Sequence, residues 1–188
     1  QLGEKRTLQG QWVMSHYYGS GPTIVVQDNY ASAEDAVNDD AWIHVGEKWE
    51  AASEEERKEM ESIVSEYSAF WNGHTDETRR VDWENNHIAG ENVDSSGYFI
   101  LVIGKYNTTG NQGAMGQAYH DWVTIPTVEA GVGMFGNFSF HLTGSGSDLM
   151  VATGYKNMHD FATSLENASS GPAEARQKFW SLVEGEHE

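Results

Sequence analysis

Histidine is the side chain of this sequence best suited to chemistry, because the 188 residues include eight histidines and no cysteine. Imidazole exchanges a proton near neutral pH and is a common ligand of transition metals. The absence of cysteine excludes disulfide bonds, thiolate metal sites and a cysteine nucleophile. The sequence also lacks a nucleophile elbow, a P-loop, a dinucleotide fingerprint and an HExxH motif. Any candidate site therefore depends on the histidines.

His16 and His141 form the first candidate pair, because each precedes a Gly-Ser-Gly segment by the same spacing. Two imidazoles close together would bind a transition metal or a haem iron, or handle a proton. In the alternative, each fills a half-buried strand position with one hydrogen bond. Tyr17 and Trp122 are the aromatic candidates for a ligand site, although most aromatic residues are expected in the core.

A second metal hypothesis concerns His74 and Asp76, which follow a predicted long helix. A carboxylate two residues from an imidazole can share a metal or orient the ring. The alternative is a polar helix exit. The metal hypothesis thus covers His16, His141, His74 and Asp76. His120 and Asp121 are adjacent on a predicted helix, where successive side chains diverge by about 100°, so we expect them on the surface and not in one site.

An internal repeat indicates how these residues are positioned. Residues 12–37 align without gaps to residues 137–162, and seven of the 26 positions are identical where chance gives roughly one or two. A second block aligns residues 55–64 with residues 174–183 in the same order. We predict an internal duplication. The identical pairs of the first block are His16/His141, Gly19/Gly144, Ser20/Ser145, Gly21/Gly146, Val26/Val151, Tyr30/Tyr155 and Asp35/Asp160.

Each repeat is predicted to be a β-hairpin followed by helices. Residues 137–143 alternate between apolar and polar, the glycines then interrupt the strand, and residues 149–155 resume an extended apolar run. Ser32 and Asn157 stand where a helix N-cap is expected. Ser53 with Glu56 has the spacing of a capping box at the start of a long helix.

Between the hairpins, residues 98–106 form an apolar run that predicts a strand buried on both faces. Residues 112–130 predict a helix, with Met115, Ala118, Tyr119, Trp122 and Val123 facing inward and a bend or end near Pro126. The second half therefore has the order strand, helix, strand, strand, helix, which is typical of a ferredoxin-like unit.

The chain resembles the dimeric α+β barrel superfamily in its order of elements, its Gly-Ser-Gly hairpins and its aromatic-rich helices. Within that superfamily it is most similar to secreted bacterial proteins that contain two ferredoxin-like units and have no assigned activity. The resemblance implies an α+β fold of two ferredoxin-like repeats that form a barrel with antiparallel sheets and flanking helices. It places the first unit at residues 1–92, without its first strand and helix, and the second at residues 93–188, without its last strand.

The charge of the chain restricts its partners. With 29 acidic and 11 basic residues, the formal net charge of −18 repels phosphate, so we expect no nucleic-acid partner. No apolar run approaches the roughly 20 residues of a membrane-spanning helix, so we expect no membrane insertion.

The function expected from these patterns is that of a non-enzymatic extracellular or periplasmic binding or assembly protein. The alternative is a small-molecule enzyme, either cofactor-free or dependent on haem or metal, that uses His16 or His141 in a hydrophobic cleft. Because each repeat lacks elements of the other, we expect either a longer chain or open sheet edges that self-associate. Sequons occur at Asn107, Asn137 and Asn167 and occur readily by chance.

Overall fold

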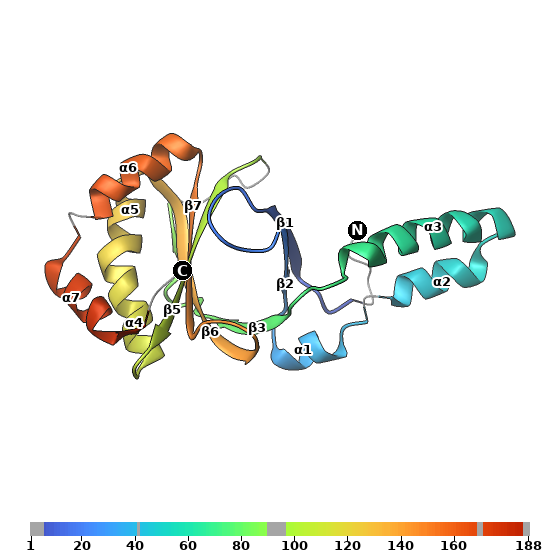
Figure 1. Cartoon of the computed structure of the whole chain (residues 1–188), viewed down its shortest axis with the longest axis horizontal. Helices are drawn as coiled ribbons and strands as arrows, with labels where there is room; N and C mark the ends of the chain where they lie inside the picture. The colour runs from blue at the N-terminus through green and yellow to red at the C-terminus, as the bar shows by residue number, and fades with distance from the viewer. Residues whose placement is uncertain (1–5, 41, 90–96, 169–170, 186–188) are drawn as a thin grey trace. The chain divides into compact units, whose positions relative to one another are not determined.

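The computed structural model describes residues 6–40, 42–89, 97–168 and 171–185, with the side chains of 167 and 168 left out. The chain divides into two compact units, an N-terminal unit up to His74 and a C-terminal unit from Thr75 (Figure 1). Both units combine helices with antiparallel strands, so the chain is an α+β protein. The predicted boundary between residues 92 and 93 lies outside the described residues.

The N-terminal unit contains one hairpin and three helices. The hairpin pairs β1 (Gly10–Ser15) with β2 (Ile24–Asn29), and the helices are α1 (Ala33–Asn38), α2 (Ile43–Ala51) and α3 (Glu54–Phe70). The Ser32 side chain caps α1, and Ser53 with Glu56 forms the predicted capping box at the start of α3. Side-chain caps satisfy N–H groups that a helix start leaves unpaired, so both starts are encoded locally.

A buried carboxylate connects the two ends of this hairpin to α1. Asp39, whose side chain is 3% exposed, accepts hydrogen bonds from the Arg6 guanidinium, from the Thr7 backbone N–H at 3.1 Å and from the Tyr30 hydroxyl at 3.0 Å. The hydrogen bond from Arg6 lowers the pKa of Asp39 far below its usual range, although burial opposes this. Asp39 is therefore charged throughout the neutral range.

The C-terminal unit is built on a six-stranded antiparallel sheet with the order β3-β6-β7-β5-β8, in which β4 also pairs with β6. Its strands are β3 (Glu77–Val81), β4 (His87–Ile88), β5 (Ile100–Thr108), β6 (Gly133–Gly144), β7 (Leu149–Tyr155) and β8 (Val183–Glu184). Its helices are α4 (Gln112–Tyr119), the π-helical turn η1 (His120–Thr124), α5 (Ile125–Glu129), α6 (Met158–Ala168) and α7 (Ala173–Leu182).

From β5 to β8 the chain runs strand, helix, strand, strand, helix, strand, which is compatible with a ferredoxin-like unit. The sequence placed no last strand after α7, yet the two-residue β8 pairs there with Asn107 and Thr108 of β5. Two residues are too few to show the alternation of a strand, so the sequence pattern could not predict β8. β3 and β4, which the sequence grouped with the first repeat, pair with β6 of the C-terminal unit.

The core of the C-terminal unit lies on the face of the sheet covered by α4 to α7 (Figure 1). Phe138 of β6 and Leu149 of β7 are 1% and 0% exposed, and Met115 of α4 and Phe179 of α7 pack against them. Gly116 allows α4 to approach the sheet closely, because a Cβ there would lie 2.6 Å from the Phe138 ring. The predicted strand at residues 98–106 is present as β5, but its residues from Ile100 to Tyr106 are only half-buried and Tyr98 lies exposed before it.

The two hairpins have the same strand register. Val13 pairs with Val26 in the N-terminal unit, and Phe138 pairs with Val151, each 125 residues further on, in the C-terminal unit. Gly19 and its aligned partner Gly144 both have positive φ, 98° and 92°, as glycine tolerates in a turn. In the described part of the chain the strands form two open sheets and no closed barrel.

Candidate functional site

His16 and Tyr17 lie in the loop between β1 and β2 and are both exposed. The His16 ring donates through Nε2 to the Tyr18 carbonyl at 2.9 Å, which is a local contact within the loop. The Tyr17 side chain is 78% exposed. Their contribution to a ligand site stays a prediction.

His141 and Trp122 lie in the C-terminal unit. His141 is half-buried on β6, and its Nε2 is buried without a hydrogen-bond partner. Trp122 on η1 packs its ring against Phe179 and Trp180, at centroid distances of 5.6 and 6.0 Å. Trp122 thus has a packing role. His16 and His141 belong to different units, so their pairing stays a prediction.

His74 and Asp76 lie at the end of one unit and the start of the next. The His74 ring packs edge-on against Trp71 at 5.2 Å, and its Nδ1 donates to the Trp71 carbonyl, as a polar helix exit would. The Asp76 carbonyl accepts from Ser145. Within the described residues, no group of three or more His, Asp or Glu side chains is arranged to hold a metal ion.

The structure brings together a different histidine pair, His87 of β4 and His120 of η1. Their ring centroids are 5.8 Å apart and the rings are nearly perpendicular, at 79°. His120 is only 6% exposed, and both of its ring nitrogens are buried without a hydrogen-bond partner. The Phe138 ring also packs against it, at 6.2 Å. A buried polar group without a partner costs about 1–3 kcal/mol, so this pair stands out chemically.

His120 lies four residues after Gly116, on the same side of the helix, and both positions face the Phe138 ring of the sheet. A π-helical turn begins at His120. The Ile125 N–H donates to the His120 carbonyl five residues earlier, which adds one residue to the turn. Thr124 in the same turn contacts Gly136, where a Cβ would lie 2.5 Å from the Thr124 methyl carbon. Gly136 pairs with His87 across β4 and β6, so this close approach brings the two histidines together. Single π turns inside helices are frequent at functional sites.

Burial lowers the pKa of His120, while the carboxylates of Asp121 and Asp82 oppose this effect. The Asp121 Oδ1 lies 3.6 Å from His120 Nδ1, which is longer than a hydrogen bond. Gln117 holds that carboxylate through a hydrogen bond of 2.7 Å. Burial thus favours the neutral form of the His120 imidazole, and the negative charges of Asp121 and Asp82 favour the protonated form.

The expected surface position of His120 is wrong. In an unbroken α-helix its side chain would fall outside the apolar stripe formed by Met115, Tyr119 and Trp122. His120 nevertheless lies four residues after Gly116, on the side of the helix that contacts the Phe138 ring, and it is 6% exposed.

A second feature is an exposed apolar face on the N-terminal hairpin, here named the Val13 face, which consists of Val13, Ile24 and Val26. These side chains are 67%, 49% and 39% exposed. Their aligned counterparts in the C-terminal hairpin are Phe138, Leu149 and Val151, which are 1%, 0% and 1% exposed. Aligned strand positions thus form the core of one unit and an open surface of the other.

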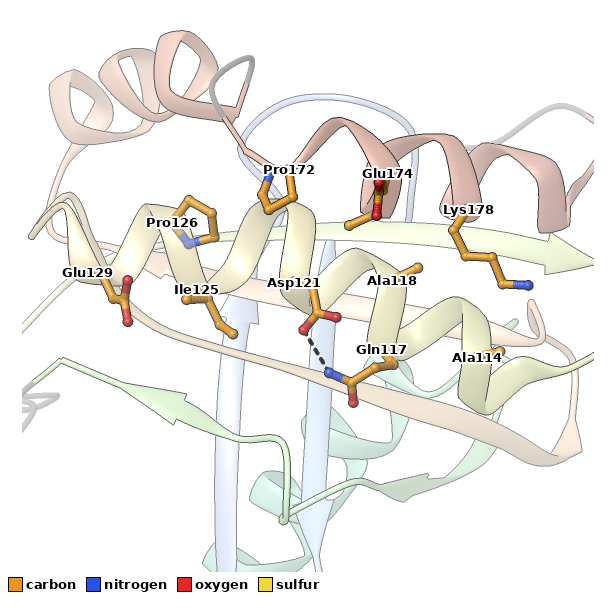
Figure 2. Close-up of a pocket in the computed structure, with 11 residues that line it drawn as sticks. Ala114, Gln117, Ala118, Asp121, Ile125, Pro126, Glu129, Pro172, Glu174 and Lys178 are labelled. Atoms are coloured by element: carbon orange, nitrogen blue, oxygen red, sulfur yellow. Dashed lines mark hydrogen bonds between the residues drawn. The ribbon is translucent and has the colours of Figure 1, made fainter.

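An open groove lies between α7 and the helical segment α4–η1–α5 (Figure 2). Figure 2 shows Glu174 and Lys178 of α7 beside Ala118 and Ala114 of the neighbouring helical segment. The groove is mainly apolar. Its lining comprises Ala114, Gln117, Ala118, Asp121, Ile125, Pro126, Glu129, Pro172, Glu174, Ala175 and Lys178.

Comparison with known proteins finds no matching family model, no similar curated protein and no similar solved structure.

Proposed function

We propose that the chain is a non-enzymatic extracellular or periplasmic assembly protein, whose N-terminal hairpin binds a strand and a helix from a partner polypeptide. The observation that carries this proposal is the exposed Val13 face, whose aligned counterpart is fully covered in the C-terminal unit. Exposed apolar patches on folded proteins mark interaction sites. In the described part of the chain no helix is long and apolar enough to span a membrane.

The C-terminal unit indicates what kind of strand would pair with the hairpin. β5 pairs antiparallel with the outer edge of β7 from Ile100↔Tyr155 to Tyr106↔Leu149. By the alignment, β7 corresponds to β2, whose outer edge has no strand beside it among the described residues. An open edge presents unpaired N–H and C=O groups that readily accept another strand.

The C-terminal unit also indicates what kind of helix the partner would supply. α4 follows β5 and lies across the core face of β6 and β7, with Gly116 close to Phe138. A matching partner would therefore supply an apolar strand followed by a helix with small residues on one side. The helix would cover Val13, Ile24 and Val26, and burial of apolar area at about 25 cal/mol per Å² would favour binding.

This proposal includes a duplication of two ferredoxin-like repeats, which a partner segment would complete toward an α+β barrel. Three features support it: the common hairpin register, the positive φ of Gly19 and Gly144, and aligned helix starts. α1 begins at Ala33 and α6 at Met158, and in both helices the third residue, Asp35 or Asp160, donates its N–H to the side chain of the capping residue, Ser32 or Asn157.

The test uses a peptide of residues 98–119 as the probe, because this segment is the strand and helix that cover the C-terminal hairpin. We expect saturable binding to the full chain by fluorescence anisotropy, at least tenfold weaker binding to Val26→Glu, and unchanged binding to Thr23→Glu. Thr23 is exposed and lies just before β2, so it controls for added charge. Equal binding by all three proteins, or no binding by the parent, would contradict the proposal.

One observation favours the alternative of a small-molecule enzyme, namely the buried and unpartnered Nε2 of His141. Such a nitrogen is available to a ligand or a proton. Replacing His16 and His141 by glutamine would lower the content of bound small molecule in purified protein if this alternative is right. Unchanged ligand content with a modest loss of stability would assign both residues to packing.

A further inference from the structure

We propose that His120 is an acid-sensitive switch in the contact between η1 and the sheet. At neutral pH its uncharged ring packs against Phe138 of β6 and His87 of β4. At mildly acidic pH the protonated ring leaves this position and pairs with the carboxylate of Asp121. All four residues lie in the C-terminal unit, so the proposal does not depend on the assembly function of the N-terminal hairpin.

The buried position of His120 suits a neutral ring and not a cation. The side chain is only 6% exposed, and both ring nitrogens are buried without a hydrogen-bond partner. Two rings pack against it, the apolar ring of Phe138 at a centroid distance of 6.2 Å and the ring of His87 at 5.8 Å. A buried charge without a partner is far less favourable than a buried neutral polar group, so protonation and burial of this ring oppose each other.

The charges that act on His120 come from three residues. Asp121 on η1 and Asp82, directly after β3, favour the protonated ring, whereas His87 on β4 favours the neutral ring. The other elements packed on η1 are α4, α5, β6 and α7, and their ionisable residues are Tyr119, Glu129, His141, Glu174, Arg176 and Lys178. Burial has the largest effect and lowers the pKa of His120, so the neutral ring is favoured in the closed contact.

Asp121 lies where a protonated ring can reach it. Its Oδ1 is 3.6 Å from His120 Nδ1, so a small rotation of the ring would form a charge-assisted hydrogen bond. Gln117, one turn earlier, donates a hydrogen bond of 2.7 Å to the same oxygen and thereby holds the carboxylate in place (Figure 2). The Asp121 side chain is 43% exposed, so the ion pair would form close to solvent. The helical segment thus offers a buried position for the neutral ring and a nearby polar position for the charged ring.

The direction of the pH effect follows from the linkage between protonation and opening. An imidazole in water has a pKa of about 6.5, and burial lowers the pKa of His120. The closed contact therefore has its full stability above about pH 6.5, and it loses stability as the pH falls from there through the folded pKa. If the buried ring stayed unprotonated, the ratio of open to closed molecules would rise about tenfold between about pH 7.5 and pH 5.5.

The experiment combines two NMR measurements on the full chain. A pH titration of the His120 ring gives its apparent pKa, which we expect below about 6.5. Hydrogen exchange of the η1 amides, corrected for the pH dependence of intrinsic exchange, gives the open fraction, which should rise roughly threefold to tenfold between about pH 7.5 and pH 5.5. His120→Leu should abolish this rise, and Asp121→Asn should lower the apparent pKa of His120. His159→Gln is the matched control, because His159 is an exposed histidine of the same unit, and it should leave both measurements unchanged.

An apparent pKa of His120 at or above about 6.5 would overturn the proposal, as would a rise in the open fraction that persists in His120→Leu. An unchanged apparent pKa in Asp121→Asn would contradict the pairing with Asp121. Loss of the rise in His159→Gln would assign the pH effect to a histidine other than His120. Because the ring titration uses the parent chain, it decides the question even if His120→Leu does not fold.

Discussion

At the scale of single residues, His120 stabilises the protein less than its buried position suggests. Its ring occupies space beside Phe138, yet neither nitrogen has a hydrogen-bond partner and burial lowers its pKa. Apolar contact is favourable, whereas desolvation of an unpaired polar group is unfavourable. Natural proteins retain such residues mainly where they serve a function.

His120→Leu is therefore expected to leave the free energy of unfolding unchanged or to raise it by about 1 kcal/mol, because it replaces an unpaired polar group by an apolar side chain. Phe138→Ala, by contrast, should lower that free energy by about 3–5 kcal/mol through the cavity it creates. Urea denaturation measures both. A loss above about 2 kcal/mol in His120→Leu would show that the imidazole stabilises the fold through a contact of its own.

At the scale of elements, several boundaries are encoded in local sequence. The capping box at Ser53, the cap at Ser32 and the turn glycines Gly19 and Gly144 define where helices and strands begin or end. Asp39 connects several elements. It directly follows α1, and its carboxylate accepts hydrogen bonds from Arg6 and Thr7 before β1 and from Tyr30 after β2. Its contribution depends on charge and hence on pH.

Asp39→Asn is expected to destabilise the N-terminal unit by about 2 kcal/mol near neutral pH, because charge-assisted hydrogen bonds to a buried group are lost. The folded pKa of Asp39 is lowered, so its contribution is fully present above the unfolded value of about 3.9 and is lost as the pH falls below it. The difference between parent and variant should thus narrow below about pH 4.

The measurement follows native NMR signals of β1 and β2 amides during urea titrations at several pH values. Asp28→Asn is the control, because Asp28 is an exposed carboxylate of the same hairpin that accepts a hydrogen bond of 2.8 Å from Gln11. A difference between parent and Asp39→Asn that is constant from neutral to acidic pH would contradict a role for the charge.

Sequence patterns predicted the elements that have a clear period or cap, and missed those that depend on packing. Both hairpins, the strand near residues 98–106 and the helical segment from residue 112 follow from alternation and spacing. β4 and β8 have two residues each and show no period. The proximity of His87 and His120 was therefore not predictable, because it depends on the pairing of the two-residue β4 with β6.

At the scale of the whole molecule, the two units differ in how much apolar area they bury. Of the described residues up to His74, only Leu8 is a buried hydrophobic residue, and α1, α2 and α3 contain none. The C-terminal unit has a contiguous core that includes Met115, Phe138 and Phe179. A two-stranded hairpin without a covered face is marginally stable in water.

Residues 75–188 alone are therefore expected to unfold in a single cooperative thermal transition, whereas residues 1–74 alone should show a broad transition or none. Differential scanning calorimetry of the two fragments and of the full chain measures this. The full chain should reproduce the transition of fragment 75–188. A sharp independent transition of fragment 1–74 would show that its exposed apolar face needs no partner for stability.

The glycines beneath α4 and η1 have a consequence for how this protein can change. Gly116 and Gly136 have no side chain. The space at Gly116 is filled by the Phe138 ring, and the space at Gly136 is filled by the Thr124 side chain. Any larger residue at either position would require the helix to move outward, which would separate the His120 ring from the His87 ring. The distance between the helix and the sheet is therefore set at two positions that have no side chain, and we expect a substitution there to disturb His120 without contacting it.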